Sequence, residues 1–172
     1  MIYPPEELKS LLDKCHAAGS TEERGDALEC LCRFLFEKVD GVRFHARDLL
    51  NAKRSQEIDL SFWVATHSPL SFMPYVLLVE AKNRTDRVGS QEVNWFVSKL
   101  ERRKLTHGIL VAMNGISGSD KRGSHAWDVV IKAVHDGIRV VVLTREDLDS
   151  LSCADDLVRR IQDRVLHITM LA

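Results

Sequence analysis

The stretch YVLLVEAKNR, residues 75–84, decides how the rest of the chain can be arranged. It is an apolar run that stops abruptly at a glutamate and a lysine. A continuous apolar run of this length predicts a strand in the middle of a sheet, covered on both faces. Because side chains alternate along a strand, Glu80 and Lys82 share one face and Ala81 points to the other. Two charges at the end of a buried strand are either solvated or part of a site.

A second run with strand character, SQEIDLSFW at residues 55–63, contains Asp59. Its side chains alternate, with Ile58, Leu60, Phe62 and Val64 on one side and Asp59, Ser61 and Trp63 on the other. The connection THSPLSFMP, residues 66–74, is rich in proline and serine, as a loop between two strands should be. If the two runs pair as a hairpin, Asp59 lies beside Glu80.

The remaining patterns place these strands in an α/β fold. Apolar residues at three-to-four spacing predict helices, and short apolar or alternating runs predict strands. In chain order we expect helices at 6–18 and 22–39, strands at 41–46, 57–65 and 75–82, helix 90–104, strand 107–114, helix 119–137, strand 138–144 and helix 154–168. Ser20 with Glu23 predicts a capping box, and Gly137 predicts a helix end. Three meandering strands and two further β-α units predict a mixed sheet of about five strands with helices on both faces.

Length and composition are those of a globular protein. The 172 residues are expected to form one domain, with an N-terminal helix (1–19), a core (20–150) and a C-terminal helix (151–172). A net charge of −1 gives no global basic field, so a nucleic acid would have to be bound by local patches. No run is long enough for a membrane span and the first residues lack a signal-peptide pattern, so we expect a cytoplasmic protein. The four cysteines lack zinc-site spacing.

The carboxylate pair predicts a specific chemistry. Asp59 and Glu80 repel each other when side by side unless a cation neutralises them. Their oxygens suit Mg²⁺, which polarises a phosphoryl oxygen and generates hydroxide from water near neutral pH. Lys82 would stabilise the charge that develops in the transition state. The alternative is a chance E-x-K of solvated charges. Against it stand the apolar strand that the pair ends, the spacing of Asp59, and Gln91 in the following helix.

On these residues the chain resembles the PD-(D/E)XK nucleases, which share the restriction-endonuclease-like fold, and is most similar to their Mrr-like branch. The family motif is an Asp at the start of one strand and (D/E)-x-K in the next, and it falls on Asp59, Glu80 and Lys82. Ile58 stands where the motif has proline. The order of strands and helices in the C-terminal half is also similar to the Mrr pattern, so the resemblance spans roughly residues 20–150.

The resemblance implies further site residues. Family members often have a glutamate in the helix before the sheet, where RGDALECL offers Glu29, and a glutamine in the helix after the lysine, where VGSQEV offers Gln91. Glu29 also fits a plain residue at the edge of the apolar helix face, and Gln91 a plain helix N-terminal residue. The expected ion is Mg²⁺, with Mn²⁺ as a substitute, bound by Asp59, Glu80 and the backbone carbonyl of Ala81.

Basic residues are grouped in three loops near the expected site. They are Lys53, Arg54, Arg84, Arg87, Lys121 and Arg122. Gathered at one edge of the sheet, these loops would form a positive rim that binds phosphates in a salt-dependent manner, independent of sequence. The alternative is that the charges only keep the loops solvated.

These observations favour a Mg²⁺-dependent DNA endonuclease of a restriction or phage-defence system. A chain of this length has no room for a separate target-recognition domain. We therefore expect the nuclease module of a longer effector, association with other effector subunits, or a homodimer or higher oligomer. Two alternatives stay open: a structure-selective resolvase or repair nuclease on the same fold, and a non-catalytic nucleic-acid-binding or assembly module. A preference for branched DNA would distinguish the first, and the joint presence of Asp59, Glu80 and Lys82 argues against the second.

Overall fold

The computed structural model describes residues 1–17, 19–50, 57–118 and 126–172. Its elements are α1 (Pro5–Ala17), α2 (Thr21–Glu37), β1 (Val42–Leu50), β2 (Glu57–Val64), β3 (Val76–Lys82), α3 (Ser90–Arg102), β4 (His107–Ala112), α4 (Ala126–His135), β5 (Arg139–Leu143), α5 (Arg145–Asp149) and α6 (Ala154–Leu171). This order confirms the predicted α/β class, and every predicted strand is present.

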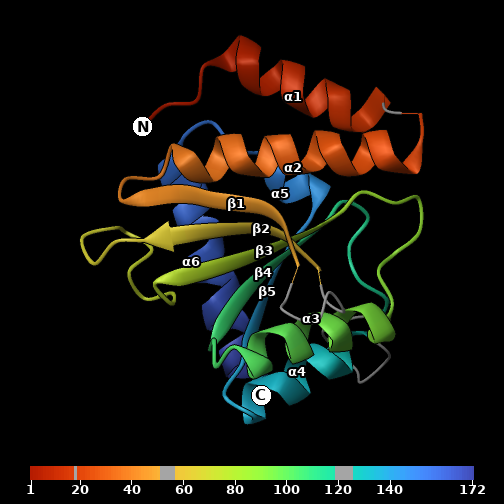
Figure 1. Ribbon diagram of the computed structural model, residues 1–172, viewed down its shortest axis with the longest axis vertical. Coiled ribbons are helices and arrows are strands. Elements are labelled where there is room, and N and C mark those ends of the chain that lie inside the picture. The colour runs from red at the N-terminus through yellow and green to blue at the C-terminus, as the bar shows by residue number, and fades with distance from the viewer. Residues whose placement is uncertain (18, 51–56, 119–125) are drawn as a thin grey trace.

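The strands form one mixed sheet in the order β1-β2-β3-β4-β5. The first three pair antiparallel, as the meander predicts, and β3, β4 and β5 pair parallel. Helices cover both faces. On one side lie α2, with α1 outside it, and α6, and on the other lie α3 and α4 (Figure 1). β3 is therefore the central strand, where the antiparallel and parallel halves of the sheet meet.

Side chains of β3 alternate between two apolar layers. Leu77 and Val79 belong to the layer beneath α2 and α6, whereas Leu78 belongs to the layer formed with α3 and α4. Strand alternation puts Glu80 and Lys82 on the Leu78 side of the sheet. The strand thus directs both charged side chains to the edge of the α3–α4 layer, as its sequence predicts.

Local sequence signals set the helix ends. The Glu23 amide donates to the Ser20 hydroxyl at 3.1 Å and the Ser20 amide donates to the Glu23 carboxylate at 2.9 Å, which confirms the capping box. Gly137 follows α4 with a φ of 79°, a conformation that glycine adopts at little cost. The start of the predicted helix 119–137 lies outside the described residues before Ala126. The sequence does not predict α5, because five residues are too few for a periodic pattern.

The β1–β2 hairpin is irregular near the expected site. Its ladder has a register shift between Phe44 and Ala46, and Asp48 has a positive φ of 52°. The expectation that Ile58 shares a layer with Leu60 is wrong, because Ile58 packs in the α3–α4 layer. Bulges increase local twist and bend a strand. Figure 1 shows the ends of β1 and β2 turning toward α3, and Ile58 near the start of β2 belongs to the apolar layer that α3 and α4 form.

The first residues of the chain are joined to the start of α6. The Met1 carbonyl accepts a hydrogen bond from the Ala154 amide at 2.8 Å, and the Tyr3 amide donates to the Ser152 carbonyl at 3.1 Å. The buried Tyr3 side chain donates its hydroxyl proton to the Leu35 carbonyl on α2 at 3.2 Å. The N-terminal segment therefore contacts both α2 and α6.

Close packing of α3 on β4 requires a glycine in the strand. A Cβ at Gly108 would lie 2.7 Å from Leu100 Cδ2 and 2.8 Å from Phe96 Cζ. We expect Gly108→Ala to lower the free energy of unfolding by about 1–3 kcal/mol through overpacking. Gly25→Ala is the control, because its Cβ meets no atom within 4 Å and alanine is favoured in a helix by about 0.5–1 kcal/mol. Urea unfolding of both variants measures the difference, and equal effects would contradict the packing account.

Candidate active site

The site begins where β2 leaves β3. Toward the carboxyl end of β3, the final residue pair of their ladder is Leu60 with Val79. Asp59 precedes Leu60 in β2 and so lies just beyond this pair. The Asp59 carboxylate takes the place of a backbone acceptor, because its Oδ2 accepts a hydrogen bond from the Ala81 amide at 2.8 Å. In a strand the N–H and C=O of one residue point to the same side. The Ala81 carbonyl therefore also faces the edge of β3 on which Asp59 lies.

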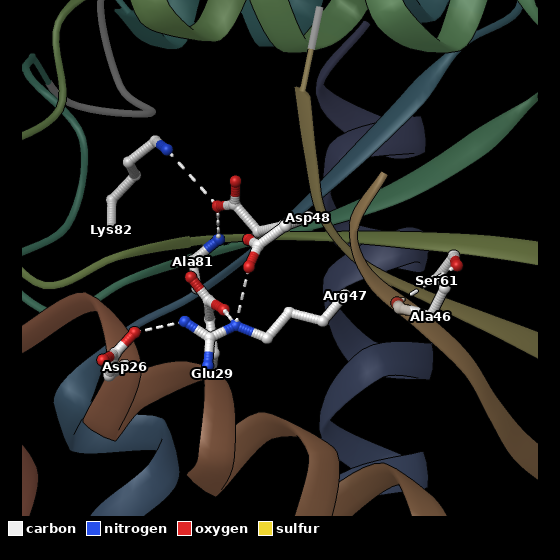
Figure 2. A network of polar contacts seen from close by, with 9 residues as sticks. Asp26, Glu29, Ala46, Arg47, Asp48, Ser61, Ala81 and Lys82 are labelled. Carbon is white, nitrogen blue, oxygen red and sulfur yellow. Dashed lines mark hydrogen bonds and ion pairs between the residues drawn. The ribbon is translucent and has the colours of Figure 1, made fainter. Parts of the chain in front are cut away.

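One ammonium group connects the two predicted carboxylates. Lys82 Nζ lies 3.3 Å from Asp59 Oδ2 and 2.9 Å from Glu80 Oε1. Figure 2 shows the Lys82 and Ala81 nitrogens directed at the same acceptor. The structure thus brings Asp59, Glu80 and Lys82 together on one side of the sheet, at the end of its central strand.

A second lysine, which the sequence analysis did not single out, completes the surroundings of Glu80. Lys99 Nζ lies 2.6 Å from Glu80 Oε2, and both side chains are nearly buried. Lys99 is on α3, next to the buried Leu100 and three residues after the buried Phe96. The sequence signal that could have identified Lys99 is its position beside the apolar stripe of the helix that follows the E-x-K segment.

Glu29 belongs to α2, which covers the face of the sheet opposite α3 and α4. It is buried, unlike the competing acids Glu22, Glu23 and Glu37 of the same helix. Arg47 of β1 lies against it, with Nε 2.5 Å from Glu29 Oε2. This is an ion pair without a well-aligned hydrogen bond, so the buried Oε2 keeps unused acceptor capacity.

Arg47 gathers three acids around its guanidinium. Besides Glu29 it pairs with Asp26 of α2 and with Asp48 of its own strand (Figure 2), the latter at 3.1 Å. The sequence gives no signal for this cluster, because Asp26 and Glu29 on α2 are distant in the chain from Arg47 on β1. The cluster ties the irregular end of the β1–β2 hairpin to α2, close to Asp59.

Burial and like charge dominate the electrostatics of the carboxylate pair. Burial raises the pKa of Asp59, and the neighbouring Glu80 carboxylate raises it further. Burial opposes the charge of Lys82, but the Glu80 and Asp59 carboxylates outweigh it and raise the Lys82 pKa above its usual value. Lys82 is therefore a firmly protonated cation at neutral pH, suited to balancing negative charge and unsuited to accepting a proton.

The other predicted residues are less closely connected to the pair. Gln91 is exposed in the first turn of α3, and no hydrogen bond joins its side chain to the carboxylates among the described residues. Arg84 pairs with Glu92 of α3 at 2.5 Å, and Arg87 is exposed in the same loop. The predicted basic residues Lys53, Arg54, Lys121 and Arg122 lie outside the described residues.

Arg87 borders a groove of about 920 Å³ at the carboxyl ends of β4 and β5. Its lining also includes Asn114, Trp127, Thr144 and Arg145. Asn114 donates to the Thr85 carbonyl at 3.3 Å, which connects the groove to the loop after Lys82. The groove thus opens on the same edge of the parallel half of the sheet as the end of β3.

The donor set at the end of β3 suits a hard divalent cation. Asp59, Glu80 and the Ala81 carbonyl offer oxygen atoms only, as Mg²⁺ prefers. The Lys82 ammonium already lies between the two carboxylates, so the site stabilises positive charge there. Within the described parts of the chain, no group of three His, Cys, Asp or Glu side chains is arranged so that it could hold a metal ion. A bound ion would therefore need a backbone carbonyl or water beside the two carboxylates.

Comparison with known families agrees with this geometry. The family model Mrr_cat, described as restriction endonuclease, matches residues 22–152, which is most of the chain and contains every element from α2 to α5. The chain belongs to the Mrr restriction-endonuclease family. The predicted family and the restriction-endonuclease-like fold are both confirmed. A search of the curated proteins found no match.

Family membership describes a nuclease domain that takes DNA as its substrate, and the roles of individual residues remain predictions. Across residues 1–17, 19–50, 57–118 and 126–172, no helix has the length and apolar character needed to span a membrane.

Glu29 predicts a pH dependence of stability. Burial raises its pKa from 4.5 to about 7; the Arg47 charge opposes this rise and the Asp59 carboxylate adds to it. Between pH 4.5 and about pH 7 the Glu29 carboxyl keeps its proton in the folded state but has lost it in the unfolded state. The free energy of unfolding therefore falls as the pH rises through this interval. Glu29→Gln keeps the neutral form at every pH. We therefore expect wild type to lose stability relative to Glu29→Gln from about pH 5 to about pH 8.

Urea unfolding in EDTA at both pH values measures this difference. Glu22→Gln is the control, since Glu22 is exposed on the same helix. Parallel pH profiles for wild type and Glu29→Gln would show that Glu29 titrates normally.

Proposed function

We propose that the protein is a Mg²⁺-dependent endonuclease that hydrolyses phosphodiester bonds in DNA. The observation that carries this proposal is the meeting of Asp59 and Glu80 at one lysine ammonium, at the end of the central strand of a restriction-endonuclease-family domain. A carboxylate pair held this close, with cations beside it, is costly in a protein that does not use it.

Each residue has a defined task in this proposal. Asp59 and Glu80 bind the ion together with the Ala81 carbonyl, and the Ala81 amide fixes the orientation of the Asp59 carboxylate. The bound ion supplies Lewis-acid polarisation of the phosphoryl oxygen and lowers the pKa of water. Lys82, as a permanent cation, stabilises the attacking oxygen and the negative charge at phosphorus. The Asp59 carboxylate adds to the raised pKa of Glu29, which places the two acids near each other, and in this proposal Glu29 positions water at the α2 side of the site.

The cellular setting is part of the same proposal. The family description as restriction endonuclease supports action on foreign DNA in a restriction or phage-defence system of the cytoplasm. The 172 residues are proposed to be one nuclease domain, with target selection supplied by further domains, effector subunits or a second copy. Mn²⁺ is proposed to replace Mg²⁺, because it accepts the same oxygen ligands.

Removing the charges at the end of β3 tests the proposal directly. Wild type should nick supercoiled plasmid in Mg²⁺ and not in EDTA. Glu80→Ala and Lys82→Ala should each slow cleavage by about 10²–10³, or roughly 3–4 kcal/mol, because they remove stabilisation of the transition state. Glu6→Ala is the control, since Glu6 is an exposed acid on the outer helix α1. If Lys82→Ala cuts at the wild-type rate, Lys82 has no catalytic role and is an ordinary charged residue at the end of a strand.

Arg87 tests the nucleic-acid interface separately from the chemistry. Arg87→Ala should weaken DNA binding and lower the slope of log affinity against log salt by about 0.9, the contribution of one phosphate contact. Cleavage should recover at high DNA concentration, because the reacting groups are unchanged. Lys9→Ala provides the control, as Lys9 is exposed on the outer helix α1. Fluorescence anisotropy at several salt concentrations gives the slope, and an equal slope for wild type and Arg87→Ala would exclude a phosphate contact.

A further inference from the structure

We propose that Lys99 is a positioning residue that holds Glu80 by one oxygen and limits it to a single coordination bond with the metal ion. This inference rests on the proposed function and assigns a specific task to a side chain that the family motif does not contain. Its basis is the division of the Glu80 carboxylate between two lysines, with Oε1 2.9 Å from Lys82 Nζ and Oε2 2.6 Å from Lys99 Nζ.

The two lysines are attached to the fold in different ways. Lys99 belongs to α3, where Phe96 and Leu100 on either side of it in the helix are buried in the core, and its side chain is only 12% exposed. Lys82 is the last residue of β3 and is shared between two carboxylates. Lys99 is thus the more buried of the two lysines, since the Lys82 side chain is 22% exposed.

This difference matters when a divalent cation enters. Lys82 contacts Asp59 Oδ2 and Glu80 Oε1, so an ion held by both carboxylates would compete with Lys82 for these oxygens. It does not compete for Glu80 Oε2, which Lys99 holds at 2.6 Å. Lys99 would therefore keep Glu80 in place when Lys82 is released from the carboxylates and is free to contact the reacting phosphate.

Lys99 also affects the charge available to the ion. The two carboxylates that would bind the ion, Asp59 and Glu80, are contacted by two cations, Lys82 and Lys99. Each of these cations repels a divalent ion through a partly buried medium. Removal of Lys99 should therefore strengthen cation binding while allowing Glu80 to bind the ion through both oxygens, in a geometry unsuited to the reaction.

The test compares Mn²⁺ binding with catalysis in Lys99→Met. Titration calorimetry should show Mn²⁺ bound about tenfold more tightly than by wild type, because one repelling charge is gone. Plasmid cleavage at saturating Mn²⁺ should nevertheless fall by about tenfold or more, because the ion and its ligands are misplaced. Lys99→Arg, which keeps the charge and a donor, should restore wild-type Mn²⁺ affinity. Lys9→Met controls for the loss of one positive charge at a distant exposed position.

Opposite changes in binding and cleavage distinguish a positioning role from a structural one. A folding defect would weaken Mn²⁺ binding and lower the melting temperature, and Lys99→Met with unchanged or weaker Mn²⁺ binding would overturn the proposal. Unchanged cleavage at saturating Mn²⁺ would overturn it as well. Asp59→Ala tests the proposed function independently, because it should lose Mn²⁺ binding. Equal Mn²⁺ binding by Asp59→Ala and wild type would contradict the metal site itself. If Asp59→Ala loses Mn²⁺ binding but Lys99→Met does not change as expected, only the role of Lys99 is contradicted.

Discussion

Repulsion between two largely buried carboxylates is the constraint on which the centre of this molecule depends. Asp59 and Glu80 are tolerable together only because an amide and two ammonium groups contact their oxygens. That requirement explains several features of the fold at once. β2 must leave the ladder at Asp59 so that its side chain can reach the Ala81 amide, and α3 must cross the end of β3 so that Lys99 can reach Glu80.

Features set by short-range periodicity could be predicted from the sequence, whereas contacts set by helix rotation and strand bending could not. Alternation along β2 and β3 was enough to place Asp59 beside Glu80. Lys99 depended on how α3 is turned on its axis, and Arg47 on the irregular end of β1, where Asp48 has a positive φ. The short α5 and the packing of Ile58 were missed for related reasons, because neither follows from a regular repeat.

On the α2 side of the site, a buried carboxylate is paired with an arginine but is not fully hydrogen-bonded. Glu29 is buried against Arg47, yet its Oε2 has no well-aligned hydrogen bond. Natural folds seldom leave a buried acceptor in this condition, and such exceptions concentrate where function requires them. The same helix carries exposed acids, Glu22, Glu23 and Glu37, so Glu29 is the acid of this helix that faces the interior beside Arg47.

The contacts between the first residues and the start of α6 have a consequence for how this domain is delimited. The family match covers residues 22–152, but Met1 and Tyr3 bond to Ala154 and Ser152, and Tyr3 also reaches α2. Asn83, directly after the E-x-K segment, donates to carbonyls of α1 and α2. The contacts of the fold therefore extend beyond residues 22–152, and trimming the chain to the family boundaries would remove the Cys15 carbonyl, one of the two acceptors of Asn83 in the loop that borders the active site.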